Sequence, residues 1–257
     1  MDRSKIHEKA KTIEIKAKTK KEFFLLHGYT GSPTDFNELG KYLNKKFNAN
    51  VKIIRLIGHG QKIENLSGLE YKDFFQQAEK ELKKDIEKGR KIIIGGISVG
   101  SLVALHLASK YPVRGVLNVS VPYKNKFITK IISFLEPIIL KKIWTKPIPD
   151  CERELRKKAF FYDTSISGLR VIKHGKKELK HSLKNITAPS LIIHVSSDYI
   201  FHPKGAELIT KKISSKIKEF VLFETEKKAS HNPFYTKHHK RLYKLFEDFI
   251  KKNKLFD

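Results

Sequence analysis

The sequence predicts an α/β fold: a mostly parallel sheet flanked by helices, with a helical cap inserted over one edge of the sheet. Three observations lead to this prediction. Short apolar and β-branched runs alternate with helix-spaced apolar residues up to residue 121, an order typical of parallel strands joined by helical crossovers. A serine flanked by glycines lies where one of these strands turns into a helix. The alternation is interrupted over about 122–187 and then resumes.

The individual elements follow from the period of the apolar residues. Runs rich in Ile, Val, Leu and Phe predict strands over 12–17, 22–26, 51–57, 92–94, 115–119, 190–195 and 219–223. The first of these alternates only weakly and is expected at the sheet edge. Apolar residues three and four apart predict helices over 34–47, 71–88, 102–110, 203–212 and 234–252.

Length and composition indicate one large domain. A chain of 257 residues with 40% apolar content can bury a core of its own. We expect a single domain over 1–257, with a core of about 20–121 and 188–257. No apolar run is long enough to span a membrane, and the first residues lack the apolar stretch of a secretory signal. With a single cysteine, Cys151, and no internal disulfide, the protein is expected to be cytoplasmic.

The formal net charge of +26 is extreme and allows two interpretations. A site for nucleic acid or for an anionic membrane would use such a charge. However, only eight of the 53 basic residues are arginine, the residue that nucleic-acid sites favour. The lysines are also spread along the whole chain. We therefore expect a solvated lysine surface with no specific nucleic-acid partner, and at most a weak, salt-sensitive association with anionic membranes.

The segment 122–187 is too long for an ordinary connection between a strand and a helix. Its most apolar part, residues 127–144, has a proline in its middle and lysines at its borders. A helical cap over an active-site mouth is the favoured interpretation, and an amphipathic helix on a membrane surface is the alternative. In the cap interpretation, the side chains expected to line a substrate pocket are Phe127, Ile131, Phe134, Leu135 and Ile138.

The stretch 91–105 carries the strongest chemical signal. Three isoleucines lead into Gly-Ile-Ser-Val-Gly, residues 96–100, and an apolar helix follows. A serine at such a tight strand-to-helix turn has a strained backbone, and Gly96 and Gly100 are needed because larger residues would collide with the strand and the helix. The helix also directs unpaired N–H groups to the place where an oxyanion would form. A glycine-rich turn with an incidental Ser98 is the simpler alternative, which the flanking strand and helix disfavour.

Two further glycine loops follow predicted strands. Residues 27–31, His-Gly-Tyr-Thr-Gly, come directly after the first apolar run, and residues 58–60, Gly-His-Gly, come after the next strand. Glycines give backbone N–H groups the freedom to turn into a cavity at the carboxyl edge of the sheet. An oxyanion hole needs two such donors, one from the 27–31 loop and one from the residue after the nucleophile.

A nucleophilic serine needs a base to accept its proton and an acid to orient that base. His231 is the predicted base, because it lies in a loop beyond the last strand, whereas the histidines at 238–239 fall inside a basic helix. Asp198 is the predicted acid, because it follows an apolar strand and precedes His231 in the usual order. The competing acids follow the last strand, which is the wrong strand for that order: Glu224 and Glu226.

The motifs, in their order and spacing, resemble those of the small bacterial carboxylesterases and monoacylglycerol lipases of the α/β-hydrolase superfamily. They are FFLLHGYTGSPTDFNELGKYL, GHG, GISVGS, SSDYIFHP and SHNPF, and the resemblance covers 22–122 and 188–250 but is weak across the cap. It implies three catalytic residues: Ser98 as nucleophile, Asp198 as acid and His231 as base. It also implies an oxyanion hole formed by the backbone N–H groups of Tyr29 and Val99. Gly28 is the glycine that the resemblance implies in the loop of Tyr29.

The resemblance implies hydrolysis of esters through an acyl-enzyme, on a small-molecule ester or lipid-like substrate, with no metal and no cofactor. Two positions depart from the family pattern: Ser101 replaces a glycine that is usual after the elbow, and Asn232 replaces a small apolar residue after the histidine. A thioesterase or an acyltransferase would use the same residues. The alternative from another class is a non-catalytic basic binding protein on a hydrolase scaffold. The oligomeric state and the natural substrate are not predicted.

Overall fold

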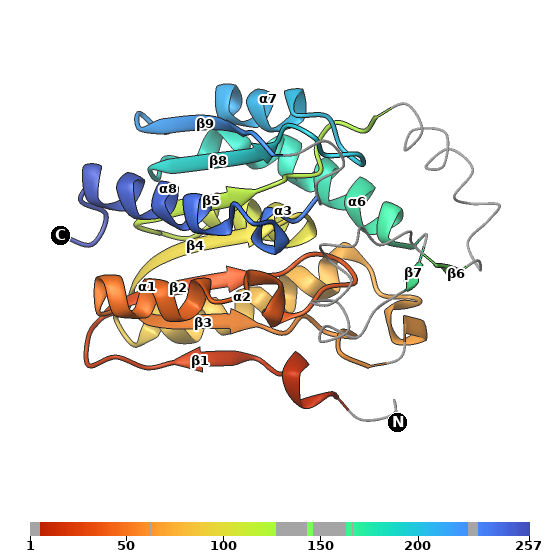
Figure 1. Cartoon of the computed structure of the whole chain (residues 1–257), viewed down its shortest axis with the longest axis horizontal. Helices are drawn as coiled ribbons and strands as arrows, with labels where there is room; N and C mark the ends of the chain where they lie inside the picture. The colour runs from red at the N-terminus through yellow and green to blue at the C-terminus, as the bar shows by residue number, and fades with distance from the viewer. Residues whose placement is uncertain (1–5, 62, 127–142, 146–162, 166, 226–230) are drawn as a thin grey trace.

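The computed structural model of the chain describes residues 6–61, 63–126, 143–145, 163–165, 167–225 and 231–257. Its main feature is a sheet of seven strands in the spatial order β1-β3-β2-β4-β5-β8-β9. The strands are β1 Ile13–Ile15, β2 Lys21–Leu26, β3 Asn50–Ile54, β4 Lys91–Ile97, β5 Gly115–Val119, β8 Ser190–Val195 and β9 Lys218–Phe223. Strand β1 is antiparallel to β3, and all other neighbours are parallel. The carboxyl ends of the parallel strands therefore share one edge, on the right in Figure 1.

Helices cover both faces of this sheet (Figure 1). One face packs against α1 Leu39–Phe47 and α8 His239–Lys252. The other packs against α2 Tyr71–Glu87, α3 Val99–Ala108, α6 Ser167–Ser182 and α7 Lys204–Lys212. The short 3₁₀ turns are η1 Glu8–Ala10, η2 Pro33–Phe36, η3 Ile63–Leu66, η4 Leu183–Asn185 and η5 Pro233–Tyr235. Two further strands, β6 Ile143–Thr145 and β7 Asp163–Ser165, form a separate antiparallel pair. The α/β class predicted from the sequence is confirmed.

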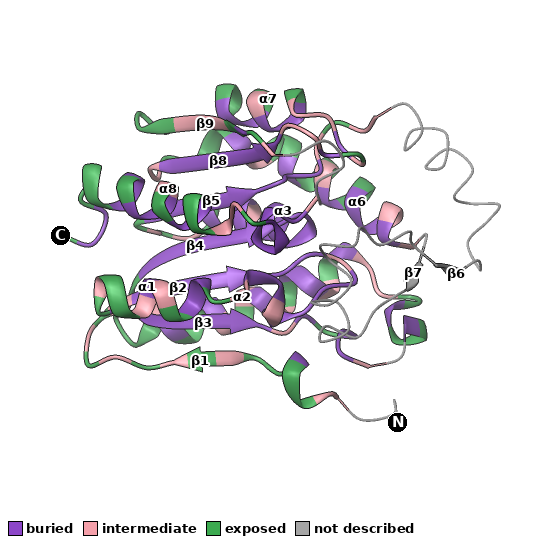
Figure 2. Cartoon of the chain, viewed as in Figure 1, coloured by how far each residue is buried: buried purple, intermediate pink, exposed green. Residues whose placement is uncertain are grey.

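The core has two halves because successive side chains of a strand point to opposite faces. In β2, Phe23 and Leu25 join the half under α1 and α8, whereas Phe24 and Leu26 join the half under α2 and α3. Figure 2 shows the central strands buried, with exposed residues on the outward sides of the helices. Burial on both faces explains why these strands read as continuous apolar runs rather than as alternating ones.

Among the predicted boundaries that differ from the structure, three have a clear local cause. The predicted helix 34–47 is divided at Asn37, whose φ of 50° ends η2 before α1 begins. The third strand ends at Ile54, because the N–H groups of the next three residues donate to side chains of Thr12, His27 and Gln77. The last helix begins at His239 and not at 234, since residues 233–235 form the separate turn η5.

Part of the segment 122–187 is a helix of the central fold. Helix α6 buries Val171, Ile172 and Leu179 in the half of the core that α2 and α3 share. The residues predicted to line a substrate pocket lie outside the described residues: Phe127, Ile131, Phe134, Leu135 and Ile138. Their place in a cap stays a prediction. No helix among the described residues is both long and apolar enough to cross a membrane.

Candidate active site

Ser98 lies in the sharp turn between β4 and α3 at the carboxyl edge of the sheet. Its φ of 54° and ψ of −121° are a conformation that a residue with a side chain rarely adopts. The turn is fixed on both sides, because the Ser98 N–H donates to Val119 and its carbonyl accepts from the N–H of Ser101. Ser98 is 8% exposed. Backbone strain held by the surrounding structure is characteristic of functional positions.

The glycines of the turn are required by close backbone contacts. A Cβ atom on Gly96 would lie 2.4 Å from the backbone of Gly100, and one on Gly100 would lie 2.1 Å from the carbonyl oxygen of Leu26. A Cβ on Gly28 would meet the Cβ of Ser98 at 3.3 Å. The predicted oxyanion loop 27–31 therefore lies directly against the predicted nucleophile.

Asp198 and His231, distant in sequence, are joined by a hydrogen bond of 2.6 Å between Oδ2 and Nδ1. Asp198 is fully buried in the loop after β8. Its other oxygen, Oδ1, accepts the N–H groups of Ile200 and Phe201 at 2.8 and 3.1 Å. Burial alone would raise the pKa of Asp198, but the charge of His231, its hydrogen bond and the adjacent His194 outweigh burial and hold this pKa far below its usual range.

The other ring nitrogen of His231, Nε2, is not engaged by Asp198. Nε2 is buried and has no hydrogen-bond partner within the described residues. The ring packs against Phe201, with centroids 5.5 Å apart. Within the described residues, no hydrogen bond joins Ser98 to His231. Hydrogen bonds between a nucleophile and its base are often long before substrate binds. The Asp198–His231 pair holds the imidazole with Nε2 as the nitrogen left to take up a proton.

Two histidines that the sequence did not single out anchor the 27–31 loop. His27 accepts the N–H of Leu56 at Nε2 and His59 accepts the N–H of Thr30 at Nε2, at 3.0 and 3.2 Å. Their Nδ1 atoms lie 2.9 and 3.0 Å from the carbonyls of Gly28 and Ile57. Both rings are therefore neutral, with the proton on Nδ1. Burial lowers the pKa of His59 to about 4 and lowers that of His27 well below its usual value.

The loop that carries Tyr29 is a turn closed by a hydrogen bond of 3.1 Å from the Gly31 N–H to the Gly28 carbonyl. The Tyr29 hydroxyl and the Ser167 hydroxyl are 2.7 Å apart, which links this loop to the first turn of α6. Val99 is the first residue of α3, where backbone N–H groups lack partners within the helix. Both predicted oxyanion donors thus belong to backbone that borders Ser98.

The two departures from the family pattern have structural partners. The Ser101 hydroxyl donates to the carbonyl of Ser98, so it braces the elbow where the family has glycine. The Asn232 side chain donates to the carbonyl of Asp35 and accepts the N–H of Phe234, at 3.1 and 3.0 Å. Asn232 therefore fixes the loop that presents His231.

Two of the competing residues, Glu224 and His239, are described, and both make their contacts away from this site. Glu224 is exposed just after β9, and Glu226 lies outside the described residues. His239 bonds to the carbonyl of Thr236 at the start of α8. No cluster of three His, Cys, Asp or Glu side chains that could hold a metal ion occurs in the parts of the chain that the structure describes.

Comparison with known sequences gives a consistent picture. The profile of a family described as serine aminopeptidase, S33, matches residues 17–234. A carboxylesterase of Bacillus subtilis is 22% identical over 209 residues, which cover 79% of this chain and 82% of the relative. A thermostable monoacylglycerol lipase of a Bacillus species is 25% identical over 200 residues, which cover 77% and 78%.

Comparison with solved structures shows the same fold. A structure of the metagenome-derived lipolytic enzymes LipS and LipT has a TM-score of 0.78 at 18% identity, covering 96% of this chain and all of the other. The monoglyceride lipase of Saccharomyces cerevisiae, in complex with a substrate analogue, has a TM-score of 0.76 at 16% identity, covering 94% and 91%. The monoacylglycerol lipase of Paleococcus ferrophilus has a TM-score of 0.70 at 18% identity, covering 94% and 98%.

Proposed function

The chain belongs to the serine aminopeptidase (S33) family of hydrolases, and on that premise we propose that it is a carboxylesterase. Its substrates are esters of short to medium acyl chains or monoacylglycerols, and the reaction passes through an acyl-enzyme on Ser98. The names of the Bacillus relatives, a carboxylesterase and a monoacylglycerol lipase, support this choice of substrate class. The single observation that carries the proposal is the buried Asp198–His231 hydrogen bond at the sheet edge that also bears the strained Ser98.

In the proposed mechanism, Nε2 of His231 takes the proton of the Ser98 hydroxyl as its oxygen attacks the ester carbonyl. The bond to the alcohol then breaks, and the alcohol leaves with the proton from His231. Water repeats the sequence: His231 takes its proton, the hydroxide attacks the acyl-enzyme, and Ser98 regains a proton as the carboxylic acid leaves. Asp198 remains ionised throughout and orients the ring, because its acceptor oxygen fixes the proton of His231 on Nδ1.

The N–H groups of Tyr29 and Val99 are proposed to hold the oxyanion. Donors that are fixed before the reaction stabilise the developing charge without reorganisation, and loss of one such donor costs about 10²–10³ in kcat. The neutral His27 and His59 rings support this role, since they hold the 27–31 loop to the residues after β3.

The family description raises a peptide substrate as the competing choice. An aminopeptidase must bind a free ammonium group, which requires a negative partner. Among the described residues, three basic side chains act on His202 in the loop after Asp198: Lys124, Lys126 and Lys204. These charges disfavour a cationic substrate and favour a neutral ester that yields a carboxylate.

The test is hydrolysis of p-nitrophenyl esters by the purified chain, with Ser98→Ala as the deciding variant. We expect Ser98→Ala to lower kcat by at least about 10³-fold while the fold is retained. Ser109→Ala, at the other end of the same helix, is the matched control and should keep wild-type turnover, because its hydroxyl only bonds the carbonyl of His106.

Each rival makes a different prediction for the same preparations. Near wild-type turnover in Ser98→Ala would overturn the assignment of the nucleophile. Faster cleavage of aminoacyl-p-nitroanilides than of esters would favour the peptidase, and preference for acyl thioesters would favour the thioesterase. Absence of any Ser98-dependent turnover would favour the non-catalytic binding protein.

A further inference from the structure

A second imidazole lies against the acid of the proposed triad. His194 is the fifth residue of β8 and is fully buried. Its Nε2 is 3.2 Å from Oδ2 of Asp198, the same oxygen that accepts the N–H of His231. Sequence analysis did not single out His194, because it sits within an apolar strand, four residues before Asp198.

The chemistry of this contact fixes the proton of His194. An unprotonated Nε2 would place its lone pair against a carboxylate oxygen at 3.2 Å, which is repulsive. The contact departs from hydrogen-bond geometry, so both Nε2 and Nδ1 of His194 are buried without a formal hydrogen-bond partner within the described residues, and Nε2 has only the Asp198 oxygen nearby. A proton on Nδ1 would therefore be a buried donor with no acceptor, which is costly. The arrangement consistent with both nitrogens is a neutral ring that carries its proton on Nε2.

We propose that His194 is a positioning residue that donates Nε2–H to Oδ2 of Asp198 and so divides that oxygen between two imidazoles. This rests on the proposed function, because it concerns the base strength of His231 in the triad. His194 fixes the orientation of the carboxylate and withdraws part of its negative charge from His231. The acidic limb of the pH–rate profile should therefore depend on whether His194 is present.

The surroundings of Asp198 leave His194 as the contact that a variant can remove cleanly. Oδ1 is held by backbone N–H groups, which no side-chain substitution deletes. The backbone carbonyl of Asp198 accepts the Lys126 ammonium, which does not touch the carboxylate. Two further basic side chains of the described residues, Lys124 and Lys204, act on the partly exposed His202 of the same loop.

Two substitutions separate the hydrogen bond from the volume of the ring. His194→Gln places an amide N–H close to the position of Nε2, whereas His194→Leu fills the site without a donor. We expect His194→Leu to move the acidic midpoint of kcat/KM upwards by about one pH unit and to lower kcat about tenfold, with KM unchanged. His194→Gln should keep a midpoint close to that of the wild type.

The matched control is Ile192→Val. Ile192 lies on the same strand, two residues before His194, so the two side chains point to the same face of the sheet. The substitution loosens the packing of β8 without contact to Asp198, so stability falls and the pH midpoint stays. A His194→Leu profile with the wild-type midpoint, or a His194→Gln profile shifted as far as that of His194→Leu, would overturn the proposal.

A second measurement needs no variant and no activity. In ¹⁵N-histidine spectra of the wild-type chain at neutral pH, we expect His194 to be the neutral Nε2–H tautomer. An Nδ1–H tautomer would contradict the inference even if ester hydrolysis is found. Conversely, the predicted tautomer in a chain without Ser98-dependent hydrolysis would contradict the proposed function and leave the Asp198–His194 contact established.

Discussion

Asp198 and Glu22 are both buried carboxyl groups of the same fold, and their surroundings shift the two pKa values in opposite directions. Asp198 lies at the carboxyl edge of the sheet, next to two imidazoles and two backbone N–H groups. Glu22 lies near the amino end of β2, 4% exposed. Burial raises the pKa of Glu22 to about 7, and the neighbouring Asp85 carboxylate adds to this, against Arg90 and Lys52.

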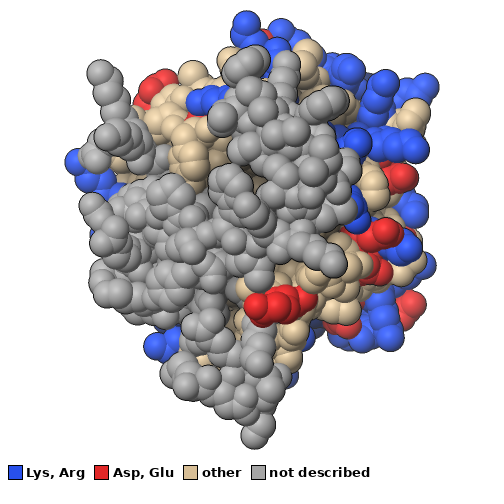
Figure 3. Space-filling model, turned by 90° about the vertical axis from the view of Figure 1, so that its right-hand side faces the viewer, with Lys and Arg blue, Asp and Glu red and all other residues tan. Residues whose placement is uncertain are grey.

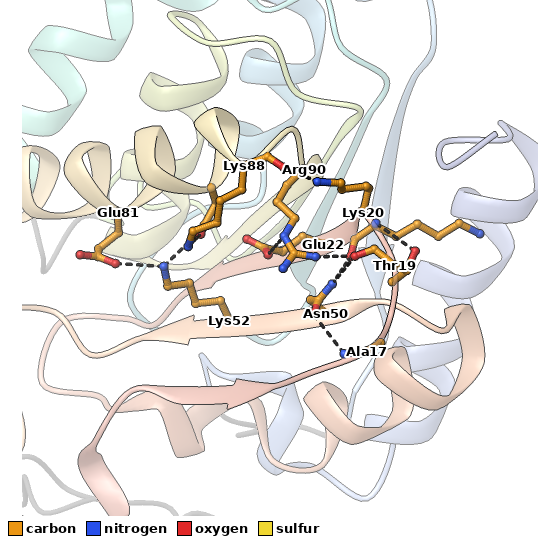
Figure 4. A network of polar contacts seen from close by, with 11 residues as sticks. Ala17, Thr19, Lys20, Glu22, Asn50, Lys52, Glu81, Lys88 and Arg90 are labelled. Atoms are coloured by element: carbon orange, nitrogen blue, oxygen red, sulfur yellow. Dashed lines mark hydrogen bonds and ion pairs between the residues drawn. The ribbon is translucent and has the colours of Figure 1, made fainter.

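The network around Glu22 ties the amino ends of three strands to α2 (Figure 4). Arg90 lies 3.4 Å from Glu22 and donates to the carbonyl of Thr19. Lys52 bonds Asp85 and Glu81 of α2 at 2.8 and 2.9 Å. Burial would lower the pKa of Lys52, but the hydrogen bonds that its ammonium donates to these two acids raise it.

The difference lies in the groups that face each buried acid. Asp198 faces hydrogen-bond donors, so it stays ionised and can orient His231. Glu22 faces another carboxylate, so at moderately acidic pH it holds a proton and acts as part of a structural network. Both carboxyl groups are buried, so burial alone does not explain why their pKa values shift in opposite directions.

The largest test of this comparison replaces each acid by its amide. Asp198→Asn should lower kcat about 10⁴-fold, because an amide at this position no longer fixes the proton of His231 on Nδ1. Glu22→Gln should keep turnover within about twofold of the wild type. Both are measured as ester hydrolysis at neutral pH, with the fold checked by circular dichroism. Equal losses for the two variants would break the division into a catalytic and a structural acid.

The next test concerns stability. Lys52→Met leaves the buried Asp85 with only the exposed Lys88 as counterion, so the free energy of unfolding should fall by about 3 kcal/mol. Lys84→Met on the same helix is the control, since Lys84 is 49% exposed in its pair with Glu81, and exposed pairs contribute about 0–1 kcal/mol. Urea denaturation measures both. A similar small effect for the two would show that the network is a solvated surface cluster.

A third test uses the pH dependence of unfolding. Because the pKa of Glu22 is raised from 4.5 to about 7 in the folded chain, its stabilising contribution is full below 4.5 and is lost as pH rises through 7. The shift corresponds to about 3 kcal/mol. Neutral His27 and His59 act in the opposite sense, losing stability as pH falls from 6.5 towards 4.

The quantity to measure is therefore the difference between Glu22→Gln and the wild type, in which the histidine contributions cancel. The variant should gain stability relative to the wild type between pH 4.5 and 8. A constant difference across this range would contradict the raised pKa of Glu22.

The smallest expected effect is that of salt. Figure 3 looks onto the carboxyl edge of the sheet and shows basic side chains at the margins of that face, with acidic ones among them. Turnover of a neutral ester should change less than about twofold between 50 and 500 mM salt, since buried pairs such as Asp198–His231 are screened little.

DNA binding should be weak and should disappear over the same range of salt concentration. Sequence-selective binding that persists at about 150 mM salt would instead indicate a dedicated basic site.

Features that depend on a few adjacent residues can be predicted from the sequence. The strand-to-helix turn at Ser98 and the apolar runs of β2, β4 and β8 follow from a few adjacent residues. The pairing of Asp198 with His231 was predicted because the order of residues along such a chain maps onto successive strands at one edge. The structure adds the hydrogen bond itself.

Contacts between residues that are distant in the sequence could not be predicted, because they depend on how the elements pack. His59 holds Thr30 across 29 positions, and nothing around either residue signals this. His194 looks like an exception in an apolar strand until its contact with Asp198 is seen. Helix α6 was expected in a cap, because its basic surface hides the apolar face that it packs on α3.

The most direct measurement is labelling of the purified chain with a fluorophosphonate, read by the mass of the intact protein and of its peptides. This reagent reports whether the edge that carries Ser98, Asp198 and His231 assembles an activated serine. We predict one adduct, on the peptide that contains Ser98, lost in Ser98→Ala and strongly slowed in His231→Ala. An unlabelled wild-type chain, or an adduct that persists in Ser98→Ala, would contradict the account.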